Sequence, residues 1–163
     1  MIDWSKQHCG VHRASAEDLL ELMPDVAQLC VETFPDPMGE YSWDVKVHML
    51  MPSQYPCIPN WHYDHVPRIN NKQDFSKVRT DLLMWLWISG EPLAEFKRDG
   101  IITPVHAETW KSFTQADIHR GTVSHAFQWR GFIRATPIEI VQPIKNCLRR
   151  HSQVYLDAES FRW

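Results

Sequence analysis

The sequence contains no long apolar run and no strong excess of one charge. No stretch approaches the roughly 18 apolar residues that a membrane-spanning helix needs, so we expect no membrane partner. Residues 1–6 lack the apolar run of a secretory signal, which favours a cytoplasmic protein. The net charge of −3 and the sequence pI of about 6.3 disfavour long nucleic-acid substrates, because no global positive field would attract them.

The sequence also lacks paired cysteines, internal repeats and low-complexity segments. Its four cysteines are Cys9, Cys30, Cys57 and Cys147. They form no Cys-x-x-Cys pair, so we expect free thiols in a reducing compartment. No second ligand pair at zinc-finger spacing follows His8, Cys9 and His12, which argues against a structural zinc there. Strands and helices do not alternate after residue 42, which argues against a nucleotide-binding parallel sheet.

What is present is a chain of 163 residues, 44% of them apolar, which suits a single domain with one core. We divide residues 1–163 into a helical part at 1–41, a strand-rich core at 42–142 and a C-terminal extension at 143–163. Apolar residues recur at helical spacing over residues 15–34, and Ser15 suits a helix cap. Pro24 interrupts this pattern, so either two shorter helices or one kinked helix fits.

From residue 42 the period of the pattern changes to two. Trp43, Val45 and Val47 fall on one strand face, and Asp44, Lys46 and His48 fall on the other. Further strands are predicted at 81–89, 93–97, 101–106, 110–113, 118–120 and 129–136, with 138–141 as an extension of the sheet. Asp99-Gly100 indicates a hairpin turn between the second and third of these. Many short strands separated by turn signals favour a sandwich or a barrel.

Three residues from two distant stretches suit a metal site. His62 and Asp64 are two residues apart, so on an extended segment their side chains point the same way. His119 is the best candidate for a third ligand. Two histidines and one carboxylate on one side of a metal leave positions open opposite them, which suits Fe(II). His65 is a poor substitute for His62, because it is next to Asp64 in the chain and the two side chains would point to opposite faces of a strand. His125 is a poor substitute for His119, because its spacing fits the pattern less well.

Two arginines follow His119 on the last predicted strand. Arg130 and Arg134 are four residues apart, so both point to the same face of that strand. A buried arginine is costly unless it meets an anion, and a ligand carboxylate provides one with good geometry.

This pattern resembles the Fe(II)/2-oxoglutarate-dependent dioxygenase superfamily. Residues 59–64 (Pro-Asn-Trp-His-Tyr-Asp) resemble its proximal iron motif. Residues 118–121 (Ile-His-Arg-Gly) through 130–136 (Arg-Gly-Phe-Ile-Arg-Ala-Thr) resemble its distal half. The resemblance extends over residues 43–140 as a pattern rather than as continuous similarity.

The resemblance implies a double-stranded β-helix (a cupin-like jelly roll) with the N-terminal helices packed outside. It implies that His62, Asp64 and His119 bind iron, and that Arg130 or Arg134 holds the far carboxylate of 2-oxoglutarate. The activity implied is oxidation of a small-molecule substrate, usually by hydroxylation. Two alternatives stay open: a cupin-like metal enzyme that does not use 2-oxoglutarate, and a non-catalytic β-barrel protein with a binding or structural role.

Overall fold

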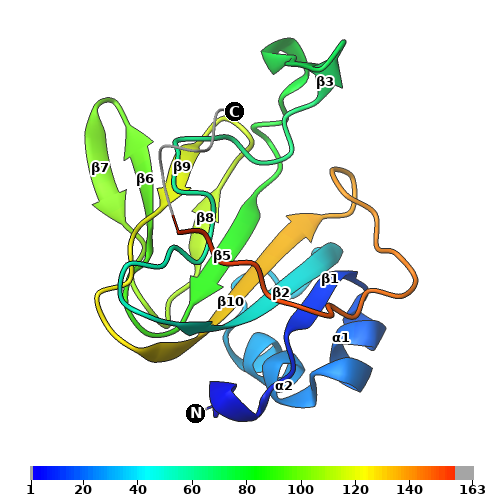
Figure 1. Cartoon of the computed structure of the whole chain (residues 1–163). Helices are drawn as coiled ribbons and strands as arrows, with labels where there is room; N and C mark the ends of the chain where they lie inside the picture. The colour runs from blue at the N-terminus through cyan, green and yellow to red at the C-terminus, as the bar shows by residue number, and fades with distance from the viewer. Residues whose placement is uncertain (1, 157–163) are drawn as a thin grey trace.

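The computed structural model describes residues 2–156 and shows a mainly β protein with two helices near its N-terminus (Figure 1). The helices are α1 (Ala16–Leu22) and α2 (Pro24–Thr33). The strands are β1 (Gly10–Ala14), β2 (Tyr41–Leu50), β3 (Arg68–Ile69), β4 (Lys72–Gln73), β5 (Met84–Ile88), β6 (Ala94–Arg98), β7 (Ile101–Pro104), β8 (Lys111–Phe113), β9 (Ile118–Gly121) and β10 (Gln128–Pro137). Single 3-10 turns lie at Trp4–Lys6 and Phe75–Lys77. The predicted mainly β class is confirmed.

The helical segment forms two helices rather than one kinked helix. Ser15 caps α1, because its hydroxyl oxygen accepts the N–H of Asp18 at 3.0 Å. Pro24 is the first residue of α2, where a missing N–H costs nothing and the fixed φ suits a helix start. The proline therefore separates the two helices and begins the second.

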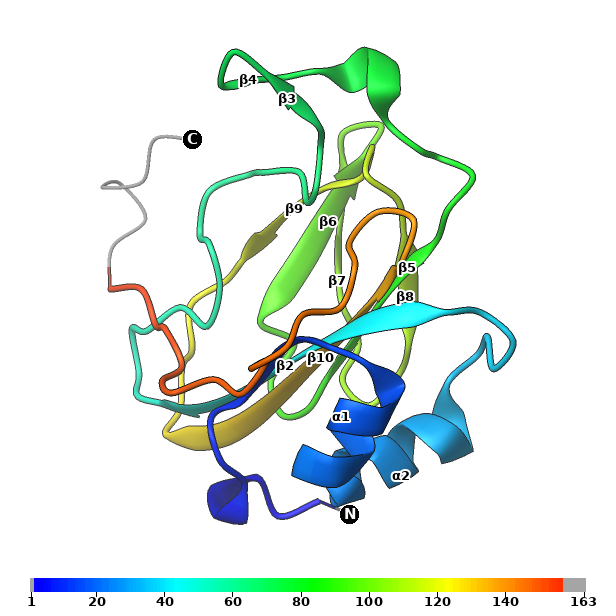
Figure 2. The same ribbon diagram turned by 90° about the vertical axis from the view of Figure 1, so that its right-hand side faces the viewer.

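In the described part of the chain, the strands form two main antiparallel sheets and a separate two-stranded hairpin, β3–β4. The larger sheet has the order β1-β2-β10-β5-β8, and the smaller has the order β7-β6-β9. Strands β2 and β10 pair along their whole length, from Tyr41 opposite Pro137 to Leu50 opposite Gln128. Figure 2 shows the helices on one side of the β2–β10 pair, while β6 and β9 lie on the other. Among the described residues, the sheets do not close into a barrel.

Each face of the larger sheet packs against a different partner. Trp43, Val45 and Val47 of β2 belong to the core that the sheet shares with the helices. Leu86 of β5 and Phe96 of β6 belong to a second core between the two sheets. Successive residues of β2 therefore point alternately to the core beneath the helices and to the opposite face of the sheet. The polar face of β2 lies on the side of the second core.

Some elements differ from those predicted. Strand β1 lies within the part predicted as helical, and the small hairpin β3–β4 lies in a stretch without a strand pattern. Residues 138–141 do not extend the sheet. They form a turn after Pro137, whose carbonyl accepts the N–H groups of Ile140 and Val141.

The C-terminal segment returns across the strands. Leu148 pairs with Val11 of β1, and Tyr155 pairs with Tyr55 in the loop after β2. Residues 157–163, the end of the predicted C-terminal extension, lie outside the described residues. In the described part of the chain, no helix has the length and apolar character needed to cross a membrane.

Candidate metal centre

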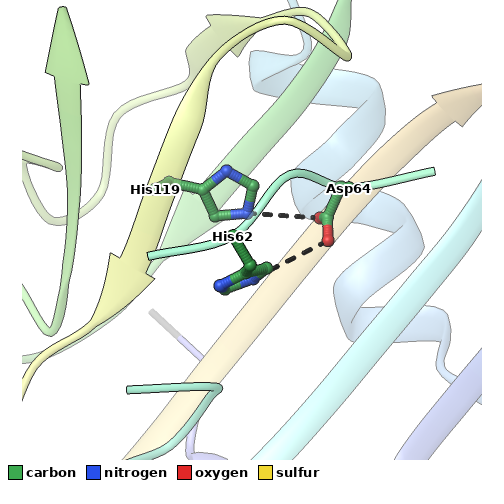
Figure 3. Close-up of side chains that lie close together, drawn as sticks. All are labelled: His62, Asp64 and His119. Atoms are coloured by element: carbon green, nitrogen blue, oxygen red, sulfur yellow. Dashed lines mark ion pairs between the residues drawn. The ribbon is translucent and has the colours of Figure 1, made fainter. Parts of the chain in front are cut away.

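Three side chains, from the segment before β3 and from β9, meet at one point (Figure 3). His62, Asp64 and His119 each offer one ligand atom, and these atoms lie within 4.8 Å of one another. Nε2 of His62 lies 3.8 Å from Oδ1 of Asp64, and Nε2 of His119 lies 3.5 Å from Oδ2. The structure thus brings together the three residues that the sequence proposed, in a geometry that could hold a metal ion.

Backbone pairing fixes the two histidines beside each other. The N–H of His62 donates to the carbonyl of His119 at 2.9 Å, and the N–H of His119 donates back at 3.0 Å. The loop before His62 continues along β9, where the N–H of Gly121 donates to the carbonyl of Ile58 at 2.7 Å. A Cβ on Gly121 would lie 2.7 Å from the carbonyl oxygen of Cys57, so this close approach requires glycine.

Hydrogen bonds at Nδ1 of His62 and of His119 set the tautomer of both imidazole rings. Nδ1 of His62 lies 2.8 Å from the carbonyl oxygen of Asn60, and Nδ1 of His119 lies 3.0 Å from that of Asp117. A carbonyl oxygen only accepts, so each Nδ1 carries a hydrogen and the neutral ring presents a lone pair at Nε2. Both lone pairs are therefore available to a metal, as in typical histidine ligands with a supporting carbonyl.

The charge states of the site also suit a cation. Burial lowers the pKa of His62, and the charge of His119 lowers it further, so His62 is neutral at neutral pH. Burial raises the pKa of Asp64, but the charge of Arg134 outweighs it and holds the pKa well below its usual value. Asp64 is therefore an anion that can accept a metal.

Arg134 is held by two carboxylates. Its Nη1 donates to Oδ2 of Asp64, and its Nη2 donates to Oδ2 of Asp44 at 2.9 Å. Asp44 is buried and also pairs with Arg149 at 3.0 Å and with His12 at 2.6 Å. Burial lowers the pKa of Arg134, but the two carboxylates raise it above its usual value, so the guanidinium stays charged.

Arg130 has no such partner. It is 0% exposed, and none of its three guanidinium nitrogens has a hydrogen-bond partner among the described residues. Burial lowers the pKa of Arg130 to about 10, and the charge of Cys57 acts against this shift. An unpaired buried guanidinium carries a desolvation cost that an incoming anion would offset.

A small cavity lies next to the three metal-binding candidates. It has a volume of about 140 Å³, which is smaller than the usual pocket for a drug-sized molecule. Its apolar wall includes Leu86, Phe113 and Phe132, and its polar wall includes Lys46 and Arg134. The size and the cationic groups suit a small anionic ligand.

The two alternative histidines lie outside the metal-binding group. His65 has a left-handed backbone with φ of 55°, and its carbonyl accepts from Gln115. His125 is exposed, and its N–H donates to Glu91. Neither side chain joins the cluster of His62, Asp64 and His119.

Sequence reasoning assigned no role to Asp44, Lys46 or Cys57. The period-two pattern of β2 had placed Asp44 and Lys46 on one face, and this face lies toward the cavity. Cys57, five residues before His62 in the chain, also lines the cavity. Burial raises the pKa of this thiol.

Comparisons with protein-family models, with curated proteins and with solved structures find no match.

Proposed function

We propose that this protein is an Fe(II)- and 2-oxoglutarate-dependent oxygenase that oxidises a small-molecule substrate. The observation that carries the proposal is the convergence of His62, Asp64 and His119 beside a cavity, with their metal-binding atoms within 4.8 Å of one another. Two imidazoles and one carboxylate with open positions are the ligand set of non-haem Fe(II) oxygenases. Iron and 2-oxoglutarate bound there would supply oxygen activation, coupled to decarboxylation of the 2-oxo acid.

The residues present fit this pair of cofactors. Both histidines present Nε2, and the Asp64 carboxylate is anionic, so the donors suit a divalent cation. The positive groups nearby suit a dicarboxylate. The protein's part is to orient these donors and to keep the cavity small and partly apolar.

Arg130 is the better candidate for the far carboxylate of 2-oxoglutarate. Arg134 already pairs with Asp44 and Asp64, so binding another carboxylate would require it to give up a partner. Arg130 lies on the same face of β10 as Phe132 and Arg134, which line the cavity, and it has no partner of its own. A carboxylate at Arg130 would satisfy a buried charge that no residue between 2 and 156 satisfies by a hydrogen bond.

We propose further that the fold is a double-stranded β-helix. Two antiparallel sheets enclose an apolar core, and Leu86, Phe113 and Phe132 of this core also line the cavity at the candidate metal site. The pairing of His62 with His119 adds the metal loop to the smaller sheet, in the order β7-β6-β9-loop. These features support a jelly-roll arrangement with helices packed on the outer face of the larger sheet.

An anaerobic titration tests the function. Fe(II) and then 2-oxoglutarate are added to the protein while its visible spectrum is recorded. We expect a weak charge-transfer band from the chelate, and we expect Asp64→Ala to lose it together with the metal. Arg130→Met should bind Fe(II) normally and need a much higher 2-oxoglutarate concentration to develop the band.

One observation favours a second candidate, a cupin-like metal enzyme that does not use 2-oxoglutarate. Arg130 does not itself line the cavity, so its guanidinium would have to be reached through a rearranged wall. In that case Fe(II) binds in the titration, but saturating 2-oxoglutarate produces no band in the native protein.

A further inference from the structure

A second, larger depression lies on the opposite side of the larger sheet from the metal centre. It has a volume of about 800 Å³ and lies between the two helices, the segment that follows α2 and residues 138–143. Its apolar wall reaches down to the buried residues Cys30 and Trp43. Leu20 of α1 and Val31 of α2 line it while 61% and 81% exposed, so its rim is apolar and open to solvent. We call this depression the helix groove.

The helix groove lies in a strongly acidic part of the chain. Residues 14–45 contain no Lys, Arg or His, and they contain eight carboxylates: Glu17, Asp18, Glu21, Asp25, Glu32, Asp36, Glu40 and Asp44. Three of these, Glu17, Asp36 and Glu40, line the groove. Among the described residues, no cationic side chain lines it. Arg13 donates instead to the carbonyl of Gln142 and is not part of the lining.

The walls of the groove also restrict the backbone of an occupant. Residues of α1 and α2 form much of the lining, and the backbone groups inside a helix already bond to one another. The described helical part of the lining therefore offers no strand edge on which an extended peptide could add itself. A helix, by contrast, forms its backbone hydrogen bonds internally and needs no backbone partner in the groove. It can place an apolar stripe against the groove, with positively charged residues on either side of that stripe.

We propose that the helix groove binds a basic amphipathic helix of a partner protein, with apolar side chains between Leu20 and Val31 and with Lys or Arg facing Glu17 and Glu40. The charge complementarity comes from a groove whose described ionisable groups are all acidic. This inference does not depend on the metal or on the proposed oxygenase activity.

The test uses the full chain and a synthetic probe. The probe is a fluorescein-labelled helical peptide of about 14 residues, about 21 Å long, with leucines on one face and lysines on the other. Binding is followed by fluorescence anisotropy at about 0.15 M salt, where charges more than about 8 Å apart are largely screened. We expect saturable binding that weakens as salt is added. A peptide with glutamates in place of the lysines should not bind.

Charge variants test the position of the peptide. Glu17→Lys combined with Glu40→Lys should weaken binding by about tenfold or more. The matched control is Glu21→Lys combined with Glu32→Lys, which makes the same charge change on exposed residues of α1 and α2 outside the groove lining. This control should change the dissociation constant by less than about threefold.

Apolar variants test the contact itself. Val31→Asp adds a negative charge but removes an apolar contact, so it should weaken binding although long-range attraction increases. The control Phe127→Asp changes an apolar residue that is 64% exposed outside the groove lining. Unchanged thermal midpoints would show that all four variants fold.

Three outcomes would overturn the proposal: no saturable binding of the lysine peptide, equal binding of the glutamate peptide, or equal loss in the groove and control variants. Sedimentation adds a fourth. A native dimer that Val31→Asp dissociates would identify a second copy of this chain as the occupant.

Discussion

Arg134 and Asp64 form an ion pair inside the candidate metal centre, in which Nη1 of the guanidinium donates to Oδ2 of the carboxylate. The same oxygen lies 3.5 Å from Nε2 of His119. A bound metal would therefore share Asp64 with an arginine that is already anchored by Asp44. This arrangement fixes the direction of the carboxylate and keeps it charged.

Replacing Arg134 with Met should make the metal-free protein less stable. Asp44 and Asp64 would lose a buried cation, and breaking such a pair costs about 3–5 kcal/mol of unfolding free energy. A divalent metal would then replace part of the missing charge, so Zn²⁺ should stabilise the variant more than the native protein. Urea unfolding with and without Zn²⁺ measures both effects.

Arg79→Met is the control for that experiment, because it breaks the exposed pair of Arg79 with Asp81, which lies outside the cavity lining. It should leave the unfolding free energy almost unchanged, because solvent screens an exposed pair. Equal stabilisation by Zn²⁺ in native protein and Arg134→Met would contradict the shared role of Asp64.

Replacing either His62 or His119 with Ala should weaken divalent metal binding by at least about 100-fold, because each removes one of three ligands. Co²⁺ is a suitable probe, since its visible spectrum reports ligand number during a titration. His125→Ala removes an exposed imidazole outside the group and should leave the titration unchanged. If His125→Ala loses Co²⁺ as strongly as His119→Ala, the assignment of the site is wrong.

Replacing Arg130 with Met should stabilise the ligand-free protein, in contrast to the same change at Arg134. The native guanidinium is buried without a hydrogen-bond partner, so its removal should raise the unfolding free energy by about 1–3 kcal/mol. The same variant should lose affinity for 2-oxoglutarate. Urea unfolding and a 2-oxoglutarate titration measure these opposite effects. Arg130→Lys keeps the buried charge and should show no gain, and a destabilised Arg130→Met would argue that Arg130 has a structural partner.

The stability of the protein should fall as the pH is lowered from 7 to 5. Burial and the charge of Arg130 together lower the pKa of His48 to about 3, whereas an unfolded histidine has a pKa of about 6.5. Between these values the unfolded chain binds a proton that folded His48 does not. The unfolding free energy therefore decreases by up to about 1.4 kcal/mol per pH unit for this residue. His65, with a pKa lowered by burial to about 4, adds a slope of the same sign.

His48→Gln tests the origin of this slope. The glutamine amide retains a donor for the Gln153 carbonyl, which lies 3.2 Å from Nε2 of His48, but it does not titrate. Urea unfolding at pH 5, 6 and 7 should show a shallower pH dependence in this variant. The exposed residue His125, changed to Gln, serves as the matched control for the substitution itself. A slope that persists in His48→Gln would assign the effect to other groups.

The sequence was most informative where one pattern dominates a segment. The alternation from Trp43 to His48 predicted both the strand β2 and its two faces, and Asp99-Gly100 predicted the β6–β7 hairpin. Ser15 and Pro24 marked the starts of the two helices, although Pro24 alone did not distinguish a kink from a break.

The elements that were not predicted have weak or interrupted patterns. Strand β1 is short, and its pairing shifts register between Val11 and Ala14, where Arg13 has φ of 52°. The residues of β3 and β4 are all exposed, so no burial pattern marks them. Their turn uses two asparagines at positive φ, Asn70 and Asn71, which is a weaker signal than Asn-Gly.

At the site, spacing predicted which residues would face one another but not how their charges would pair. Arg130 and Arg134 are equivalent in the sequence, since both fall on one face of β10. The difference between them is Asp44, which is 90 residues away from Arg134 in the chain and pairs with it across β2 and β10. Such a partner depends on strand register, which the sequence pattern alone does not fix.

The two-sided use of β2 makes the protein sensitive to changes in chain length. Deleting one residue between Tyr41 and Asp44 would turn the rest of the strand over. The carboxylate that anchors Arg134 would then point under the helices, and a valine would take its place beside the guanidinium. We therefore expect point substitutions along this strand to be tolerated far more often than single-codon deletions.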